Sequence, residues 1–297
     1  MPRFEDKVKV TDLAQLAMDC YNSPDADEYR LNNFNKLWRK VDQFPKNNWG
    51  IARDFGRPTS ADEDPKTGFY SNFYINTSKN VGVMAIRGTD SLLDKIVDAT
   101  FVLNKAIEQY DQALIYFKNL QKRFSNLSRF YVCGHSLGGI VSKMIFPRTK
   151  VNTIAFNSPG VSEYLKDNNK PFIKSASSDA RCMPILDPMA ITFCANGCPI
   201  GNLRHNNDVG PYIWLPVKGE DRIPDKSDEI DLKSLETSLL MMLEGRLTGD
   251  GDMVNEGYNE MPDFDKAAIK ARLTKYHSMA DMYNAIKNSE KYKNTRF

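Results

Sequence analysis

The feature that most constrains the fold is a glycine-flanked serine that stands between two apolar segments. Residues 129–133 (Arg-Phe-Tyr-Val-Cys) form a short apolar run typical of a buried strand, and residues 137–146 continue as a helical pattern. The connecting segment is Gly134-His-Ser-Leu-Gly-Gly139. A serine on such a turn must adopt a strained backbone conformation, and small neighbours let the strand and the helix approach each other. The pattern therefore predicts a sharp strand-to-helix turn with Ser136 at its tip.

Strands and helices alternate around this turn. Apolar runs predict strands at residues 69–75, 81–86, 129–133, 151–156 and 181–186. Helical spacing of apolar residues predicts helices at residues 10–21, 31–43, 105–125, 137–146 and 265–290. The alternation between residues 69 and 187 favours an α/β class with a mainly parallel central sheet covered by helices.

The chain reads as a single domain over residues 1–297, because no linker or repeat divides it. Residues 216–265 are polar and charged around one amphipathic helix at 228–247. We expect this stretch to be a helical insertion late in the chain. Packing on the core is the favoured explanation for the apolar side of that helix.

Charge and hydropathy exclude several classes of function. The net charge is +2, from 40 basic and 38 acidic residues, so no strong field favours nucleic acid as a partner. The first residues have no apolar core of signal-peptide length, and no later stretch approaches the ~20 apolar residues of a spanning helix. A cytoplasmic protein is therefore expected, with export only by a route that needs no cleaved signal.

The cysteines do not form a recognisable framework. They are Cys20, Cys133, Cys182, Cys194 and Cys198. An odd number in a chain of this length argues against a set of disulfides. Cys194, Cys198 and His205 lie near one another in sequence, but they lack the spacing of a zinc site. Free or buried thiols are expected, with no metal and no cofactor.

A serine nucleophile needs a base to take its proton. The chain has three histidines. His135 adjoins Ser136, and its side chain is expected to point away from the site. His277 is favoured because it begins a helical pattern near the chain end, after the position where an orienting acid is expected. His205 remains the alternative.

The base must itself be oriented, usually by a carboxylate. Asp187 directly follows the predicted strand 181–186, so we expect its carboxylate at the carboxyl end of that strand. Asp179 precedes the same strand and is the weaker candidate.

A tetrahedral intermediate also needs hydrogen-bond donors for its oxyanion. The N–H of Leu137, next after Ser136, is the first candidate. Thr89 is the second, because it lies in the turn after the buried strand 81–86 and offers both an N–H and a hydroxyl.

With these residues in view, the chain resembles the class 3 lipase family of α/β-hydrolases, which includes fungal triacylglycerol lipases and bacterial phospholipase-like relatives. The matching segments are Val83–Asp90, Tyr131–Gly139, Thr153–Gly160 and Ile185–Pro188. The resemblance covers residues 10–190 and 270–285. It implies the α/β-hydrolase fold, strengthens the oxyanion role of Thr89, and implies a lid at residues 92–104.

The expected activity is hydrolysis of carboxylic esters through an acyl-enzyme on Ser136. By resemblance the substrates are lipids or phospholipids, with transient contact to a membrane surface. The first alternative is a hydrolase of small soluble esters. The second is a non-catalytic relative that binds lipid or a protein.

Overall fold

The computed structural model places a seven-stranded sheet at the centre of the molecule. It describes residues 7–21, 37–44, 67–88, 99–161, 189–196, 198–202, 208–216, 252 and 276–297. The strands are β1 (Arg39–Phe44), β2 (Ser71–Asn76), β3 (Val81–Ile86), β4 (Arg129–His135), β5 (Asn152–Phe156), β6 (Ala190–Ala195) and β7 (Tyr212–Leu215). They lie side by side in chain order.

The sheet is mainly parallel. β1, β2 and β3 pair antiparallel, and β3 to β7 pair parallel. Every residue of β3, β5 and β6 is buried, as expected for parallel strands covered on both faces. The α/β class with a mainly parallel central sheet, expected from the sequence, is thereby confirmed.

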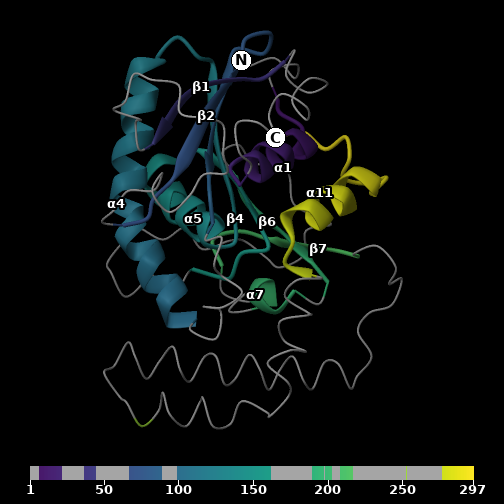
Figure 1. Cartoon of the computed structure of the whole chain (residues 1–297). Helices are drawn as coiled ribbons and strands as arrows, with labels where there is room; N and C mark the ends of the chain where they lie inside the picture. The colour runs from purple at the N-terminus through teal and green to yellow at the C-terminus, as the bar shows by residue number, and fades with distance from the viewer. Residues whose placement is uncertain are drawn as a thin grey trace, which may run out of the picture.

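Helices cover both faces of the sheet (Figure 1). They are α1 (Val10–Asp19), α4 (Ala99–Arg123), α5 (Leu137–Thr149), the short α7 (Pro199–Asn202) and α11 (Met279–Asn288). The pair α4 and α5 packs together on one side, and α1 packs with α11 on the other. The core between them is formed largely by β3, β4 and the buried side of α5.

The register of the sheet decides which loops meet at the carboxyl ends of the strands. Ile86 pairs with Gly134, His135 pairs with Phe156, and Phe156 pairs with Phe193. The segments that follow β3, β4, β5 and β6 are therefore neighbours at one edge. In parallel α/β sheets this edge is where ligands bind.

The structure differs from the sequence-based predictions in three places. Residues 39–43, expected within a helix at 31–43, belong to β1, because hydrogen bonds to β2 stabilise this polar segment as an edge strand. β6 and β7 were not expected at all. The helix expected at 105–125 begins earlier, at Ala99, so α4 includes residues 99–104 of the segment expected to form a lid.

The rest of that lid, the strand at 181–186 and, apart from Asp252, the late insertion beyond residue 216 lie outside the described residues. Within the part of the chain that the structure describes, no helix combines the length and apolar character needed to cross a membrane.

Candidate active site

Ser136 occupies the turn between β4 and α5 in a conformation that L-residues rarely adopt, with φ 56° and ψ −122°. Glycines on both sides make this turn possible. A Cβ on Gly134 would lie 2.3 Å from the Gly138 carbonyl oxygen, and one on Gly138 would lie 2.2 Å from the Ile86 carbonyl oxygen. Strain of this kind persists only where the surroundings enforce it, and it is characteristic of functional turns. The sharp turn expected from the sequence is present.

The segments expected to hold an oxyanion lie beside Ser136. Leu137 is the first residue of α5, so its N–H has no acceptor within the helix. A developing negative charge on a substrate oxygen is favoured at such a helix N-terminus. Thr89 lies outside the described residues, but its neighbour Gly88 follows β3 next to the Ser136 turn: a Cβ on Gly88 would lie 3.2 Å from the Ser136 Cβ.

His277 lies against Ser136. Its Nε2 is 2.8 Å from the Ser136 Oγ, although 141 residues separate them in sequence. Both side chains are buried, with exposed fractions of 7% and 1%. Burial, and then the neighbouring His135, hold the pKa of His277 well below its ordinary value. The imidazole is therefore neutral at pH 7, and its Nε2 can accept a proton.

The other ring nitrogen of His277 contacts a thiol rather than a carboxylate. Its Nδ1 lies 3.3 Å from the Sγ of Cys198, which also accepts a hydrogen bond from the Gly201 N–H at 3.3 Å. Burial raises the pKa of the Cys198 thiol to about 12, so the sulfur is uncharged at pH 7. Sequence reasoning treated Cys198 as an ordinary buried thiol. Its place three residues after the end of β6 is the signal that could have identified it.

Asp187, the predicted orienting acid, lies outside the described residues, as do Asp179 and His205. The structure does define the chain that follows Asp187. Met189 donates its N–H to the Asn152 side-chain oxygen at 2.9 Å, at the amino end of β5 and β6. Ser136 and His277 lie at the opposite, carboxyl edge of the sheet.

The main chain at His277 is held by Asn157. This buried residue follows β5 in a left-handed conformation with φ 45°. Its amide nitrogen donates to the Tyr276 carbonyl oxygen at 3.1 Å, while its amide oxygen accepts the Ala195 N–H at 2.8 Å. Asn157 therefore ties the residue before His277 to the ends of β5 and β6.

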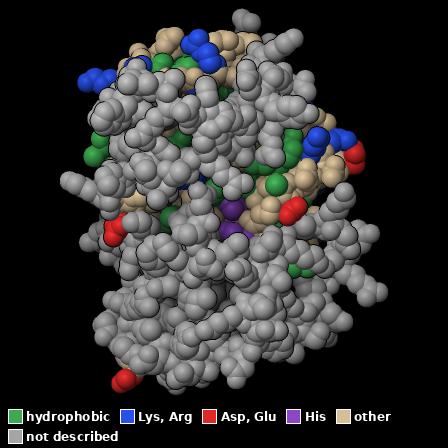
Figure 2. Space-filling view, in the orientation of Figure 1, with side chains coloured by type: hydrophobic (Ala, Val, Ile, Leu, Met, Phe, Trp, Pro, Cys, Tyr) green, Lys and Arg blue, Asp and Glu red, His purple; other side chains and the backbone are tan. Residues whose placement is uncertain are grey.

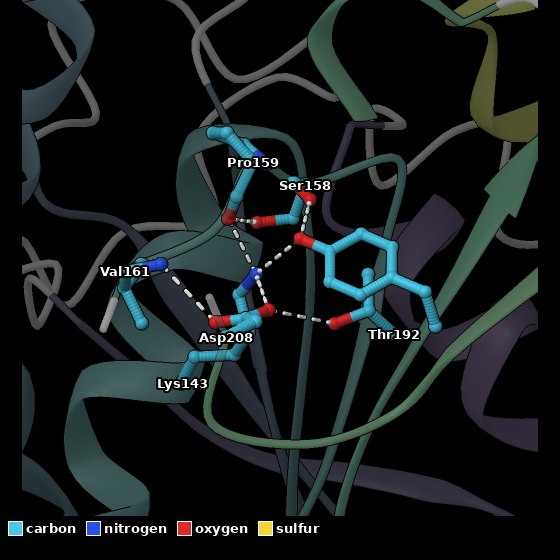
Figure 3. A network of polar contacts seen from close by, with 7 residues as sticks. Lys143, Ser158, Pro159, Val161, Thr192 and Asp208 are labelled. Atoms are coloured by element: carbon cyan, nitrogen blue, oxygen red, sulfur yellow. Dashed lines mark hydrogen bonds and ion pairs between the residues drawn. The ribbon is translucent and has the colours of Figure 1, made fainter. Parts of the chain in front are cut away.

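A buried ion pair secures the loop that contains Asn157 (Figure 3). The Lys143 Nζ, on α5, lies 2.6 Å from the Asp208 carboxylate, and it also donates to the Pro159 carbonyl oxygen. The other carboxylate oxygen accepts the Val161 N–H at 3.1 Å. The Tyr212 hydroxyl donates to the Ser158 carbonyl oxygen at 2.8 Å. The loop after β5 is thus bound to Lys143 of α5 and to Asp208 by charge-assisted hydrogen bonds, and to Tyr212 of β7 by a neutral one.

The arrangement suits acyl transfer. A serine hydroxyl faces a neutral imidazole, at a helix N-terminus and next to a second loop that can supply a donor. Figure 2 shows histidine side chains near the middle of one face. Among the described residues, no group of three His, Cys, Asp or Glu side chains could hold a metal ion.

Comparison with known proteins places the chain among phospholipase-like sequences. A family model described as the Tle-like phospholipase domain matches residues 12–181. The lipase or phospholipase-like resemblance expected from the sequence is thereby confirmed. A search of curated protein sequences finds no match.

Solved structures similar to this chain include three fungal lipases. Lipase II from Rhizopus niveus is 12% identical with a TM-score of 0.46, over 72% of this chain and 81% of that one. Lip2 lipase from Yarrowia lipolytica is 12% identical with a TM-score of 0.42, over 69% and 77%. Rhizomucor miehei triacylglyceride lipase is 11% identical with a TM-score of 0.42, over 70% and 82%.

Proposed function

Since the chain belongs to the phospholipase-like family of Tle-like phospholipase domains, we propose that it is a serine hydrolase that cleaves the carboxylic esters of lipids, phospholipids foremost. The observation that carries this proposal is the 2.8 Å contact between the Ser136 Oγ and the His277 Nε2 on a strained strand-to-helix turn. A capping serine would need neither the strained backbone nor a buried imidazole. Nucleophilic catalysis needs a base within hydrogen-bond reach of the serine, and a strained strand-to-helix turn exposes the hydroxyl to that base.

The mechanism follows from the tautomer that this contact requires. The Ser136 hydroxyl donates to Nε2, so the ring proton of neutral His277 resides on Nδ1. His277 takes the hydroxyl proton as Oγ attacks the ester carbonyl carbon. The oxyanion then accepts hydrogen bonds from the Leu137 N–H and from Thr89. His277 returns the proton to the leaving alcohol, and a water molecule hydrolyses the acyl-enzyme by the same steps.

The substrate class is tested by fatty-acid release from phosphatidylcholine vesicles, a triacylglycerol emulsion and a short nitrophenyl ester. We expect the full chain to hydrolyse the phospholipid, and Ser136→Ala to be slower by about 10⁴-fold or more. The control is Ser142→Ala, which removes a buried hydroxyl from α5 that bonds the Gly138 carbonyl oxygen and does not contact His277. This control should keep its activity.

Two other results of that assay would favour the two alternative functions, a hydrolase of small soluble esters and a non-catalytic relative. Hydrolysis confined to the nitrophenyl ester would remove the lipid part of the proposal and leave the mechanism. Vesicle binding without hydrolysis of any ester would favour a non-catalytic relative.

Two residues compete for the role of orienting His277 through Nδ1. Cys198 is the partner seen in the structure, and Asp187 is the carboxylate that the sequence favours. A neutral sulfur would fix the tautomer but would stabilise the imidazolium little, whereas a carboxylate would do both. We propose Cys198 as the partner. Met189, which follows Asp187 by two residues, lies at the amino end of β6, whereas His277 lies at the carboxyl edge of the sheet.

Paired substitutions distinguish Cys198 from Asp187. We expect Cys198→Ala to lower kcat by about tenfold, as for the loss of one modest hydrogen bond. Asp187→Asn should change kcat little. A loss of about 10⁴-fold in Asp187→Asn, with Cys198→Ala close to wild type, would instead assign the role to Asp187.

A further inference from the structure

Three hydrogen bonds, two of them part-buried and one buried, connect the loop after β3 with the main chain of His277. The Gly88 N–H donates to the Tyr21 hydroxyl at 2.8 Å. The same hydroxyl lies 2.9 Å from the His135 Nδ1. The His135 Nε2 then lies 2.7 Å from the His277 carbonyl oxygen. The series runs from the loop after β3, through Tyr21 just beyond the end of α1 and His135 at the end of β4, to the residue before the N-cap of α11.

The chemistry of the groups fixes the direction of every bond. A carbonyl oxygen only accepts, so the His135 Nε2 carries the ring proton and donates it to His277. The His135 Nδ1 is then an acceptor, and the Tyr21 O–H donates to it. The Tyr21 oxygen in turn accepts the Gly88 N–H. All three bonds are satisfied at once by one tautomer of His135.

The surroundings keep His135 in that tautomer. Its side chain is buried, and burial lowers its pKa to about 4, against which the hydrogen bond to His277 acts. The ring is therefore neutral at pH 7. It packs edge-on against the Tyr21 ring, at 5.6 Å between centroids, and lies 4.7 Å from the His277 ring. Both ring nitrogens of His135 are engaged, so it is not a competing base for Ser136.

The position of Gly88, where the series begins, has no room for a side chain. A Cβ at this position would lie 2.3 Å from the Tyr21 hydroxyl oxygen and 2.6 Å from the His135 carbonyl oxygen. Tyr21 thus contacts the backbone directly before Thr89, the proposed oxyanion donor. His135 contacts the backbone of the proposed base.

We propose that Tyr21 and His135 are positioning residues that fix the His277 main chain relative to Gly88, in the loop after β3. This inference rests on the proposed function. It adds that one series of hydrogen bonds, which does not include the reacting atoms, sets the position of the base relative to the loop after β3. Ser136 lies between the two ends, so a shift at either end changes the distances on which acyl transfer depends.

Substitutions at both positions test the role. We expect Tyr21→Phe and His135→Leu to lower kcat for the nitrophenyl ester by about 10- to 100-fold, with KM nearly unchanged, because misplacing a catalytic group by about 1 Å costs up to about 100-fold. His135→Gln keeps an N–H that can reach the His277 carbonyl oxygen and should recover part of the loss. The control is Tyr131→Phe. The Tyr131 hydroxyl donates to the Phe297 carbonyl oxygen, away from the site. This control should keep kcat even if its thermal stability falls.

Histidine ¹⁵N NMR of the full wild-type chain keeps the inference testable if a variant does not fold. We expect the His135 signals of a neutral ring protonated at Nε2 at pH 7, and a changed Nδ1 signal in Tyr21→Phe. A ring protonated at Nδ1, or wild-type kcat in folded His135→Leu, would overturn the inference. Absence of ester hydrolysis by the wild type would instead contradict the proposed function, and the tautomer would still decide whether the series exists.

Discussion

Replacing His277 with alanine is expected to lower ester hydrolysis by about 10⁴- to 10⁶-fold. The structure gives two reasons. The Nε2 of His277 is 2.8 Å from the Ser136 Oγ, and no other imidazole among the described residues contacts that oxygen. The low pKa of His277 keeps the ring unprotonated, so kcat/KM should stay level as the pH falls below the ordinary histidine value of 6.5.

His205→Ala is the matched control for this prediction, because it removes the remaining histidine that sequence reasoning left open. We expect its rate to equal that of the wild type. Rates should be measured with the nitrophenyl ester between pH 4.5 and 8. A collapse of activity in His205→Ala, with His277→Ala active, would show that the base had been assigned to the wrong histidine.

Lys143→Met is expected to lower the free energy of unfolding by about 3–5 kcal/mol, because it leaves the Asp208 carboxylate buried without its counter-charge. Both side chains are almost fully buried, with exposed fractions of 1% and 0%. The substitution also removes the donor to the Pro159 carbonyl oxygen. The loop after β5 should loosen, and with it Asn157, which holds the chain next to His277.

The control is Lys293→Met, which breaks the Lys293–Glu290 ion pair of the same 2.6 Å length at the surface. Exposed pairs contribute about 0–1 kcal/mol, so this variant should be nearly as stable as the wild type. Chemical denaturation measures both. Adding Asp208→Asn to Lys143→Met should recover part of the loss, because the amide is neutral and still accepts the Val161 N–H. Equal stability of the two single variants would contradict a stabilising role for the buried pair.

The parts of the fold that could be predicted from sequence are the fully buried strands, because each appears as a continuous apolar run. β3 is apolar at nearly every position, and the predicted strand 81–86 coincides with it. β1 is polar and forms only by pairing with β2, so its pattern resembled a surface helix. β7 has four residues, too few to show a period. Such edge elements depend on contacts between distant segments.

The residues of the candidate site also fall into those that the sequence indicates and those that only the fold brings together. Ser136 could be identified because its strained turn needs glycines that are adjacent in sequence. His277 followed from chain order. Tyr21 and His135 contact groups that are distant in sequence, and nothing next to them in the chain indicates which groups these are. The sequence signal for Cys198 is its position after β6, a strand that was not predicted. The register at the carboxyl ends of β3 to β6 brings them together.

The most direct test of Ser136 as the nucleophile is covalent labelling with a fluorophosphonate, followed by mass spectrometry of the digested protein. We expect one adduct, on the peptide that contains Ser136, which forms rapidly in the wild type and in Ser142→Ala. Labelling should be lost in Ser136→Ala and strongly slowed in His277→Ala. No adduct on Ser136 in the folded wild type, or wild-type labelling of His277→Ala, would contradict the proposed mechanism.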